Sequence, residues 1–239
     1  MSKGTIHILC LYPNEMNIYG DWGNVLTVAR RLMWHGYTPK ITQLHPGKNV
    51  PKNVNIVIGG GGQDSGQMLV EADLQRHAKT LQALADDNVP MLVVCGLYQL
   101  FGRFFKTATD EKLRGIGIFN AETHASNKRM IGNIVVNTQF GEIVGYENHS
   151  GMTMLDSGQA SFGGVSKGAG NNGTDKTEGA VYNNVYGTYM HGSLLPKNPN
   201  FADELIKKAV EHAGLEFDPN VIDDLFADKA RAIAKRRPR

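Results

Sequence analysis

Short apolar segments alternate with longer amphipathic ones through the first half of the chain. Continuous apolar, β-branched runs are typical of strands that are buried on both faces, and apolar residues at helical spacing indicate helices. We predict strands at residues 5–12, 38–45 and 90–94, a strand that enters a glycine loop within residues 53–64, and helices at residues 20–37 and 68–89. Asp21 stands where the N-cap of the first helix is expected. This alternation predicts an α/β fold with a mostly parallel sheet flanked by helices.

The second half of the chain follows a different pattern. Strand-like segments joined by short turns between residues 114 and 150 predict a more antiparallel region. Residues 156–178 are rich in Gly, Ser and Asn and predict a long flexible loop. Residues 180–191 are predicted to form one further strand that ends at His191, and two helices at about 200–213 and 220–234 to close the chain.

Composition limits the class of protein. The 239 residues are 41% hydrophobic, and we predict one domain spanning residues 1–239. A net charge of +2 is too small for an electrostatic nucleic-acid binder, and no run approaches the length of a transmembrane helix. The two cysteines cannot form a disulfide framework, so we expect a cytoplasmic protein with reduced thiols. The basic tail at residues 235–239, which ends the basic stretch 229–239, is either a fraying, solvated terminus or a docking segment for an acidic surface.

The segment "PMLVVCGLYQLFG" places Cys95 between a buried strand and a predicted helix. Such a turn exposes a nucleophile, and the free amides of the helix N-terminus lower a thiol pKa. Gly96 has no Cβ, so its amide can approach a tetrahedral intermediate. The alternative is a buried structural cysteine, which is the interpretation we give to Cys10.

A thiolate nucleophile needs a base, and His191 is the candidate among the eight histidines. It ends a predicted strand in "YGTYMHG", at the sheet edge where open α/β sheets bind ligands. The run "IVIGGGGQD" exposes successive amides at the same edge, from Gly60 to Gly62. It has neither the Lys-Ser/Thr ending of a P-loop nor a dinucleotide-binding frame, so an oxyanion hole competes with a phosphate loop and with a plain turn. No metal site is predicted.

Three motifs together resemble a known family. "VCGLYQLFG", "VGYENHSG" and "GTYMHG" resemble the class I glutamine amidotransferases of the cobyric acid synthase type. The opening "LYPNEMNIYGDWGNVLTVARR", together with "GGGGQD", "YENHSGMT" and "HGSLLPKNPNFAD", is similar to the glutaminase subunits of lipid II isoglutaminyl synthases. The resemblance spans nearly the whole chain and implies a flavodoxin-like fold.

The resemblance also implies a reaction. Cys95 would attack the side-chain amide of L-glutamine, and His191 would carry the proton to the leaving ammonia. The amides of Gly60, Gly61, Gly62 and Gly96 would hold the oxyanion. Arg129 would bind the substrate carboxylate, with Gln99 and Tyr98 as further candidates for the pocket lining.

Partners and cofactors follow from the same resemblance. No cofactor is expected in this chain, while ATP and magnesium are expected on a Mur-ligase-like synthetase subunit that forms a heterodimer with it. That subunit would use the ammonia to amidate the D-glutamate α-carboxylate of the lipid II stem peptide, without membrane insertion of this chain. The alternatives are an amidotransferase for a corrinoid or another carboxylate, and a non-enzymatic interaction module.

The sequence departs from the family at two places. Val93 and Leu97 stand where many members have glycines around the nucleophile. Ser193 stands where members with a catalytic triad have an acid two residues after the histidine. From the second departure we predict that the partner subunit supplies an acidic residue to His191; a Cys-His dyad oriented by a backbone carbonyl is the alternative.

Overall fold

The computed structural model describes residues 2–237 and contains a six-stranded sheet with the order β11-β12-β4-β3-β1-β2. Its strands are β1 (Thr5–Leu11), β2 (Thr38–Leu44), β3 (Ile56–Gly59), β4 (Met91–Val94), β11 (Ala180–Tyr182) and β12 (Val185–Thr188). All pairs in this sheet are parallel except β11 with β12. The predicted mostly parallel sheet is therefore confirmed.

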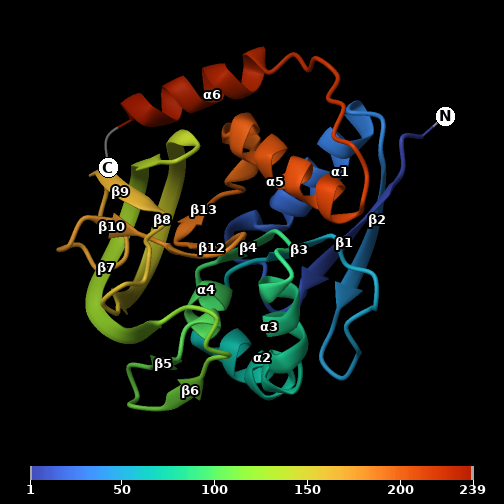
Figure 1. Ribbon diagram of the computed structural model, residues 1–239. Helices are drawn as coiled ribbons and strands as arrows, with labels where there is room; N and C mark the ends of the chain where they lie inside the picture. Colours follow the sequence, from blue (N-terminus) through green and yellow to red (C-terminus); the bar gives the residue numbers. More distant parts are fainter. Residues whose placement is uncertain (1, 238–239) are drawn as a thin grey trace.

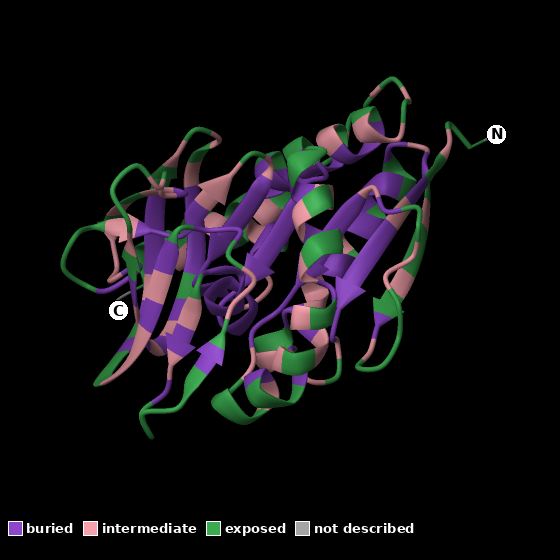
Figure 2. Ribbon diagram, turned by 60° about the horizontal axis from the view of Figure 1, so that its bottom comes forward, coloured by how far each residue is buried: buried purple, intermediate pink, exposed green. Residues whose placement is uncertain are grey.

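Helices cover both faces of this sheet. They are α1 (Trp22–Trp34), α2 (Asp64–Arg76), α3 (Ala78–Asp86), α4 (Gly96–Phe101) and α5 (Pro199–His212). Figure 1 shows α1 and α5 together on one side of the sheet and α2, α3 and α4 on the other. Because both faces are covered, every residue of β3 and β4 is buried, and the central strands are purple along their length in Figure 2.

A second sheet of seven strands lies beside the first. A long hairpin forms its body, and the shorter strands pair along it; the strands are β5 (Phe104–Lys106), β6 (Lys112–Arg114), β7 (Ala121–Thr138), β8 (Gly141–Leu155), β9 (Gly163–Lys167), β10 (Thr177–Glu178) and β13 (Met190–His191). The hairpin is antiparallel, and the colours along it in Figure 2 alternate between buried and more exposed positions. The predicted antiparallel region is confirmed.

The helix predicted at residues 68–89 is two helices. α2 begins already at Asp64, and the break falls at His77, whose backbone leaves the helical region at φ −96° and ψ 0°. The His77 ring bonds to the carbonyl oxygen of Lys48 at 2.9 Å, which ties the break to a neighbouring loop. Two successive helices therefore cover the length that apolar spacing assigned to one.

The prediction of a flexible loop at residues 156–178 is wrong. The segment contains β9 and β10, and the side chains of Asn171 and Asn172 are buried. Asn171 Nδ2 donates to the Gly179 carbonyl at 3.0 Å, and its Oδ1 accepts from the Gly179 amide at 2.9 Å. Hydrogen bonds from buried side-chain amides thus hold this segment in place, as apolar packing does elsewhere in the chain. A search for apolar patterns does not detect such a segment.

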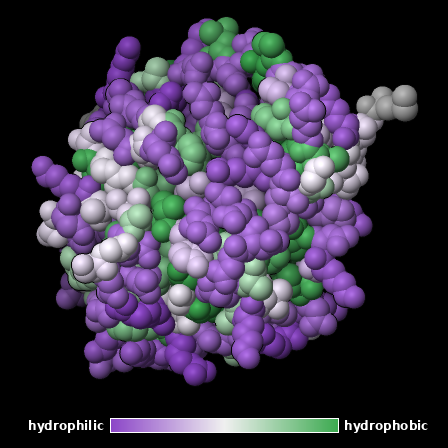
Figure 3. All heavy atoms as spheres, in the orientation of Figure 1, coloured by the Kyte–Doolittle hydropathy of each residue, from purple (hydrophilic) through white to green (hydrophobic). Residues whose placement is uncertain are grey.

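The C-terminal helix α6 (Leu225–Arg236) begins five residues later than predicted and takes in most of the basic stretch. The basic stretch is helical as far as Arg236, and Lys235 forms an ion pair with Glu142 of β8 at 2.7 Å; residues 238–239 lie outside the described residues. At the start of α6 the Phe226 side chain is 82% exposed. The face drawn in Figure 3 is mostly hydrophilic, with scattered hydrophobic groups. None of the helices within residues 2–237 has the length and hydropathy of a membrane span.

Candidate active site

Four neighbouring strands deliver the candidate residues to the carboxyl edge of the first sheet. The chain leaves β3 into the glycine run, β4 into Cys95 and β12 toward His191, while the segment after β1 returns to the same edge with Asp21. In open α/β sheets this edge holds the ligand crevice. Residues from distant parts of the sequence therefore meet at one place.

Cys95 lies at a sharp turn between β4 and α4. Its backbone has φ 50° and ψ −104°, a region that non-glycine residues rarely adopt. The turn is held on both sides, because the Cys95 amide donates to the Thr188 carbonyl at 2.8 Å and its carbonyl accepts from Gln99 at 2.9 Å. Leu97 fits in place of the family glycine because Gly59 leaves room; a Cβ there would lie 2.3 Å from Leu97 Cδ1. The local geometry is that of a nucleophile elbow.

His191 has an acidic partner within this chain. Its Nδ1 lies 3.0 Å from Asp21 Oδ2, and both side chains are fully buried. Asp21 Oδ2 also accepts from the Gly61 amide at 2.8 Å. The carboxylate therefore fixes the ring so that Nε2 is the nitrogen left to exchange a proton. An acid of this chain therefore already occupies Nδ1, the place expected for the partner's acid, while the contribution of the partner itself stays a prediction.

The charge state of His191 follows from its surroundings. Burial alone would lower its pKa, but the charge of the Cys95 thiolate and the bond to Asp21 outweigh burial and raise the pKa of His191 to about 10. A cationic imidazole beside a thiolate is the state that a cysteine nucleophile requires. His191 therefore has the charge and the position that suit a proton donor beside a cysteine nucleophile.

His191 does not end a strand of the first sheet, as was predicted. The chain leaves that sheet after Thr188, and His191 lies in β13, which pairs with Tyr146 of β8. The apolar run 185–191 therefore forms a strand of the first sheet and then a strand of the second. The prediction that His191 reaches the edge where Cys95 lies is unaffected, since β12 pairs directly with β4.

The predicted oxyanion donors divide into two groups. The Gly61 amide is already donated to Asp21, so its assignment as an oxyanion donor is corrected. Gly60 does not line the Cys95 cavity, and nothing in the structure supports its assignment. Gly62 lines the cavity, and a Cβ on Gly96 would lie 3.0 Å from the Gly62 nitrogen. The amides of Gly62 and Gly96 remain as the candidate pair.

Gly61 has a packing role instead. A Cβ at this position would lie 2.5 Å from His191 Cε1 and 2.9 Å from Cys95 Cβ. Both side chains therefore pack against the same backbone position, and only glycine fits between them.

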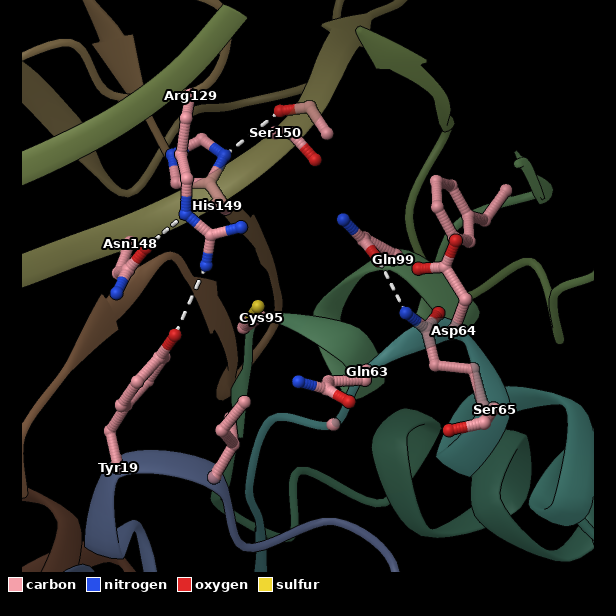
Figure 4. A pocket seen from close by; sticks show the side chains of 15 residues that line it. Tyr19, Gln63, Asp64, Ser65, Cys95, Gln99, Arg129, Asn148, His149 and Ser150 are labelled. Atoms are coloured by element: carbon pink, nitrogen blue, oxygen red, sulfur yellow. Dashed lines mark hydrogen bonds between the residues drawn. The ribbon is translucent and has the colours of Figure 1, made fainter. Parts of the chain in front are cut away.

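A cavity of about 420 Å³ opens in front of Cys95. Figure 4 shows its labelled lining, in which Arg129 and Tyr19 lie to one side of Cys95 and Gln99 to the other. Arg129 is held by Asn148 Oδ1, which accepts from its Nε at 2.7 Å, and by the Tyr19 hydroxyl, which accepts from its Nη2 at 3.1 Å. Arg129 therefore lines the same cavity as Cys95, with its guanidinium held by two neighbours.

Of the other two predicted pocket residues, only one lines the cavity. Gln99 lines the cavity, but its amide is engaged by Gln67 at 3.0 Å and by the Tyr189 hydroxyl at 3.0 Å. Tyr98 does not line the cavity: it is buried, and its hydroxyl donates to Asn171 Oδ1 at 3.0 Å. Tyr98 is therefore a core residue, and its assignment to the pocket is corrected.

A buried acid supports the segment that carries His191. Glu178 Oε1 accepts from the Thr188 hydroxyl at 3.0 Å and from the Tyr189 amide at 2.6 Å. Its Oε2 has no hydrogen-bond partner among the described residues. Burial raises the pKa of Glu178 to about 8 from 4.5 in the unfolded chain, although the two hydrogen bonds oppose this shift.

This shift predicts a pH-dependent stability. Between pH 4.5 and pH 8 the folded chain holds a proton on Glu178 that the unfolded chain has lost, so stability falls as the pH rises through this window. Glu178→Gln, which keeps the acceptor and carries no charge, is expected to raise the melting temperature relative to wild type more at pH 9 than at pH 5. Thermal unfolding at both pH values measures this, with the exposed Glu111→Gln as control. An equal difference at both pH values would contradict the prediction.

The fold and the site define a class. Residues 7–199 match the CobB/CobQ-like glutamine amidotransferase domain, and the chain belongs to this family. It is a glutamine amidotransferase, an enzyme that hydrolyses glutamine. A crystal structure titled as a glutamine amidotransferase shares the fold, with a TM-score of 0.60 at 11% identity over 84% of this chain and 98% of that one.

Relatives with more specific names cover most of the chain. It is 35% identical over 233 residues to the lipid II isoglutaminyl synthase subunit GatD of Staphylococcus aureus, which spans 95% of both chains. It is 36% identical over 212 residues to the protein of the same name from Streptococcus pneumoniae, covering 86% of this chain and 81% of that one. A probable cobyric acid synthase of Methanothermobacter thermautotrophicus is 28% identical over 75% of this chain, but only 38% of that protein is covered.

Proposed function

We propose that this chain is the glutaminase subunit of a lipid II isoglutaminyl synthase. The observation that carries the proposal is the contact of His191 with Asp21 beside the Cys95 elbow, in a chain similar to GatD along 95% of its length. The long cobyric acid synthase relative is matched over only a part of its length. Because of this partial similarity, an amidotransferase that acts on a corrinoid carboxylate is the second candidate.

The proposed reaction uses the residues of the cavity in sequence. The Cys95 thiolate attacks the carbonyl carbon of the glutamine side-chain amide, and the Gly62 and Gly96 amides hold the resulting oxyanion. His191 gives its proton to the leaving nitrogen, ammonia departs and a thioester remains. His191 then takes a proton from water, and the hydroxide attacks the thioester. Glutamate is released and the Cys95 thiolate is restored. Asp21 keeps His191 in position through both steps.

The ammonia would pass to a partner. The relatives' name describes a subunit, and we propose a Mur-ligase-like synthetase that binds ATP and magnesium and amidates the D-glutamate α-carboxylate of the lipid II stem peptide. The decisive experiment supplies the purified chain, with and without that synthetase, with L-glutamine, ATP and either lipid II or a corrinoid acid. Glutamate release together with amidated lipid II supports the proposal. Amidation of the corrinoid alone would favour the second candidate.

Arg129 is proposed to bind the α-carboxylate of glutamine, because a guanidinium offers paired donors to a carboxylate. Arg129→Ala is expected to raise the KM for L-glutamine about 10-fold or more, since a hydrogen bond between charged groups is lost. Steady-state glutamate release measures this. Lys128→Ala removes a neighbouring cation that does not line the cavity and serves as control. An unchanged KM and kcat in Arg129→Ala would make Arg129 an ordinary surface residue.

A further inference from the structure

Tyr19 lies on the same short segment as Asp21 but has no role in the reaction described so far. Its backbone has φ 59° and ψ 20°, in the left-handed region that favours glycine. The segment is fixed from two sides: the Ile18 amide donates to the Gly61 carbonyl at 2.9 Å, and Ser193 Oγ donates to the Gly20 carbonyl at 2.7 Å. A strained residue held this firmly has a defined side-chain position, and such strain gathers at functional sites.

The Tyr19 side chain contacts two groups of the proposed site. Its ring meets the His191 ring edge-on, with centroids 5.0 Å apart and an interplanar angle of 80°. Its hydroxyl accepts from Arg129 Nη2 at 3.1 Å. Figure 4 shows the phenol reaching across to Arg129, with Cys95 beside it. Tyr19 therefore links the residue that would bind the carboxylate to the residue that would move the proton.

The same contacts orient the Arg129 guanidinium. Nε donates to Asn148 and Nη2 to Tyr19, so one edge of the guanidinium is held by the protein. Within residues 2–237, Nη1 has no hydrogen-bond acceptor and neither does the Tyr19 hydroxyl proton. Both donors remain available for an anion that lies in the cavity against Arg129.

We propose that Tyr19 is a substrate-positioning residue: with Arg129 it holds the α-carboxylate at a fixed place and so sets the distance from that carboxylate to Cys95. This inference rests on the proposed function and goes beyond it by naming what selects the length of the substrate. In this proposal glutamine reaches from Arg129 to Cys95, which line the same cavity. Asparagine, one methylene shorter, cannot hold its carboxylate on Tyr19 and Arg129 while presenting its amide carbon to the thiolate.

Tyr19→Phe tests the proposal because it removes only the hydroxyl. The KM for L-glutamine is expected to rise about 10-fold, with kcat changed by less than about 3-fold, since the lost bond serves binding and leaves the reacting groups in place. The ratio of kcat/KM for glutamine over asparagine is expected to fall. Tyr182→Phe removes a phenol that donates to a surface carboxylate, Asp86, at 2.8 Å and is the matched control.

A double mutant with Arg129 distinguishes a positioning role of Tyr19 from a general structural effect. In an Arg129→Ala background, Tyr19→Phe is expected to change KM by less than about 2-fold, because both residues serve one carboxylate. Calorimetry of L-glutamine binding in a Cys95→Ala background should show the same rise in Kd for Tyr19→Phe.

The outcomes are distinguishable. An unchanged KM and Kd in Tyr19→Phe, or an equal effect with and without Arg129, would overturn the role of Tyr19 while leaving the glutaminase assignment in place. No hydrolysis of glutamine by the wild-type chain, alone or with its synthetase, would overturn the proposed function and this inference with it.

Discussion

Replacing Cys95 by alanine is expected to lower the kcat for glutamine hydrolysis by at least about 10³-fold, because the covalent route loses its nucleophile. Glutamate release by the purified chain measures this directly. Amidation by the complex with its synthetase should fall equally when glutamine is the nitrogen source. It should survive when ammonium is added instead, because activation of the acceptor takes place on the partner.

Cys10 provides the matched control. It is buried in the core, and burial raises its pKa to about 12, so its thiol is inert at neutral pH. Cys10→Ala is expected to retain hydrolysis within a few-fold of wild type. Normal glutamine-dependent turnover in Cys95→Ala would remove Cys95 from the mechanism.

Asp21→Asn is expected to reduce kcat by about 10²-fold to 10⁴-fold with little change in KM. An amide can still accept from Gly61, but it cannot stabilise the imidazolium and it favours the wrong tautomer of His191. Kinetics of the isolated chain measure this, with circular dichroism to confirm that the variant folds.

Two comparisons make the test of Asp21 specific. Asp110→Asn changes an exposed acid in a surface turn and should leave the kinetics unchanged. Acid-to-amide replacements on the synthetase surface that contacts this chain should also leave the basal rate of hydrolysis unchanged. Full activity in Asp21→Asn together with a loss on a partner replacement would show that the acid on His191 comes from the partner.

The sequence identifies the fold well because burial leaves a clear pattern. Strands covered on both faces are apolar along their length, and this is why β3 and β4 can be predicted from their apolar runs in the sequence. The segment that contains β9 and β10 has no such pattern, since buried asparagines such as Asn171 order it. The break at His77 between α2 and α3 cannot be predicted either, because the apolar spacing continues from one helix into the next.

The site was predictable where one local signal sufficed. Cys95 follows a buried strand and precedes a glycine, so its position at the elbow can be read from its neighbours. Asp21 was assigned to a helix cap, yet its side chain makes no capping bond and reaches His191, 170 positions away in sequence. The signal that could have identified it is an acid that follows the first strand of a parallel sheet, because that segment returns to the edge where the ligand binds.

Covalent labelling tests the central claim, that Cys95, activated by His191 and Asp21, attacks the side-chain carbonyl of glutamine. The chain would be incubated with a chloroketone analogue of L-glutamine, digested, and its peptides identified by mass spectrometry. We predict one adduct, on Cys95, formed in proportion to the loss of hydrolysis, prevented by excess L-glutamine and slowed in Asp21→Asn. Loss of activity with the adduct on Cys10, or continued hydrolysis by chain fully labelled at Cys95, would contradict the account.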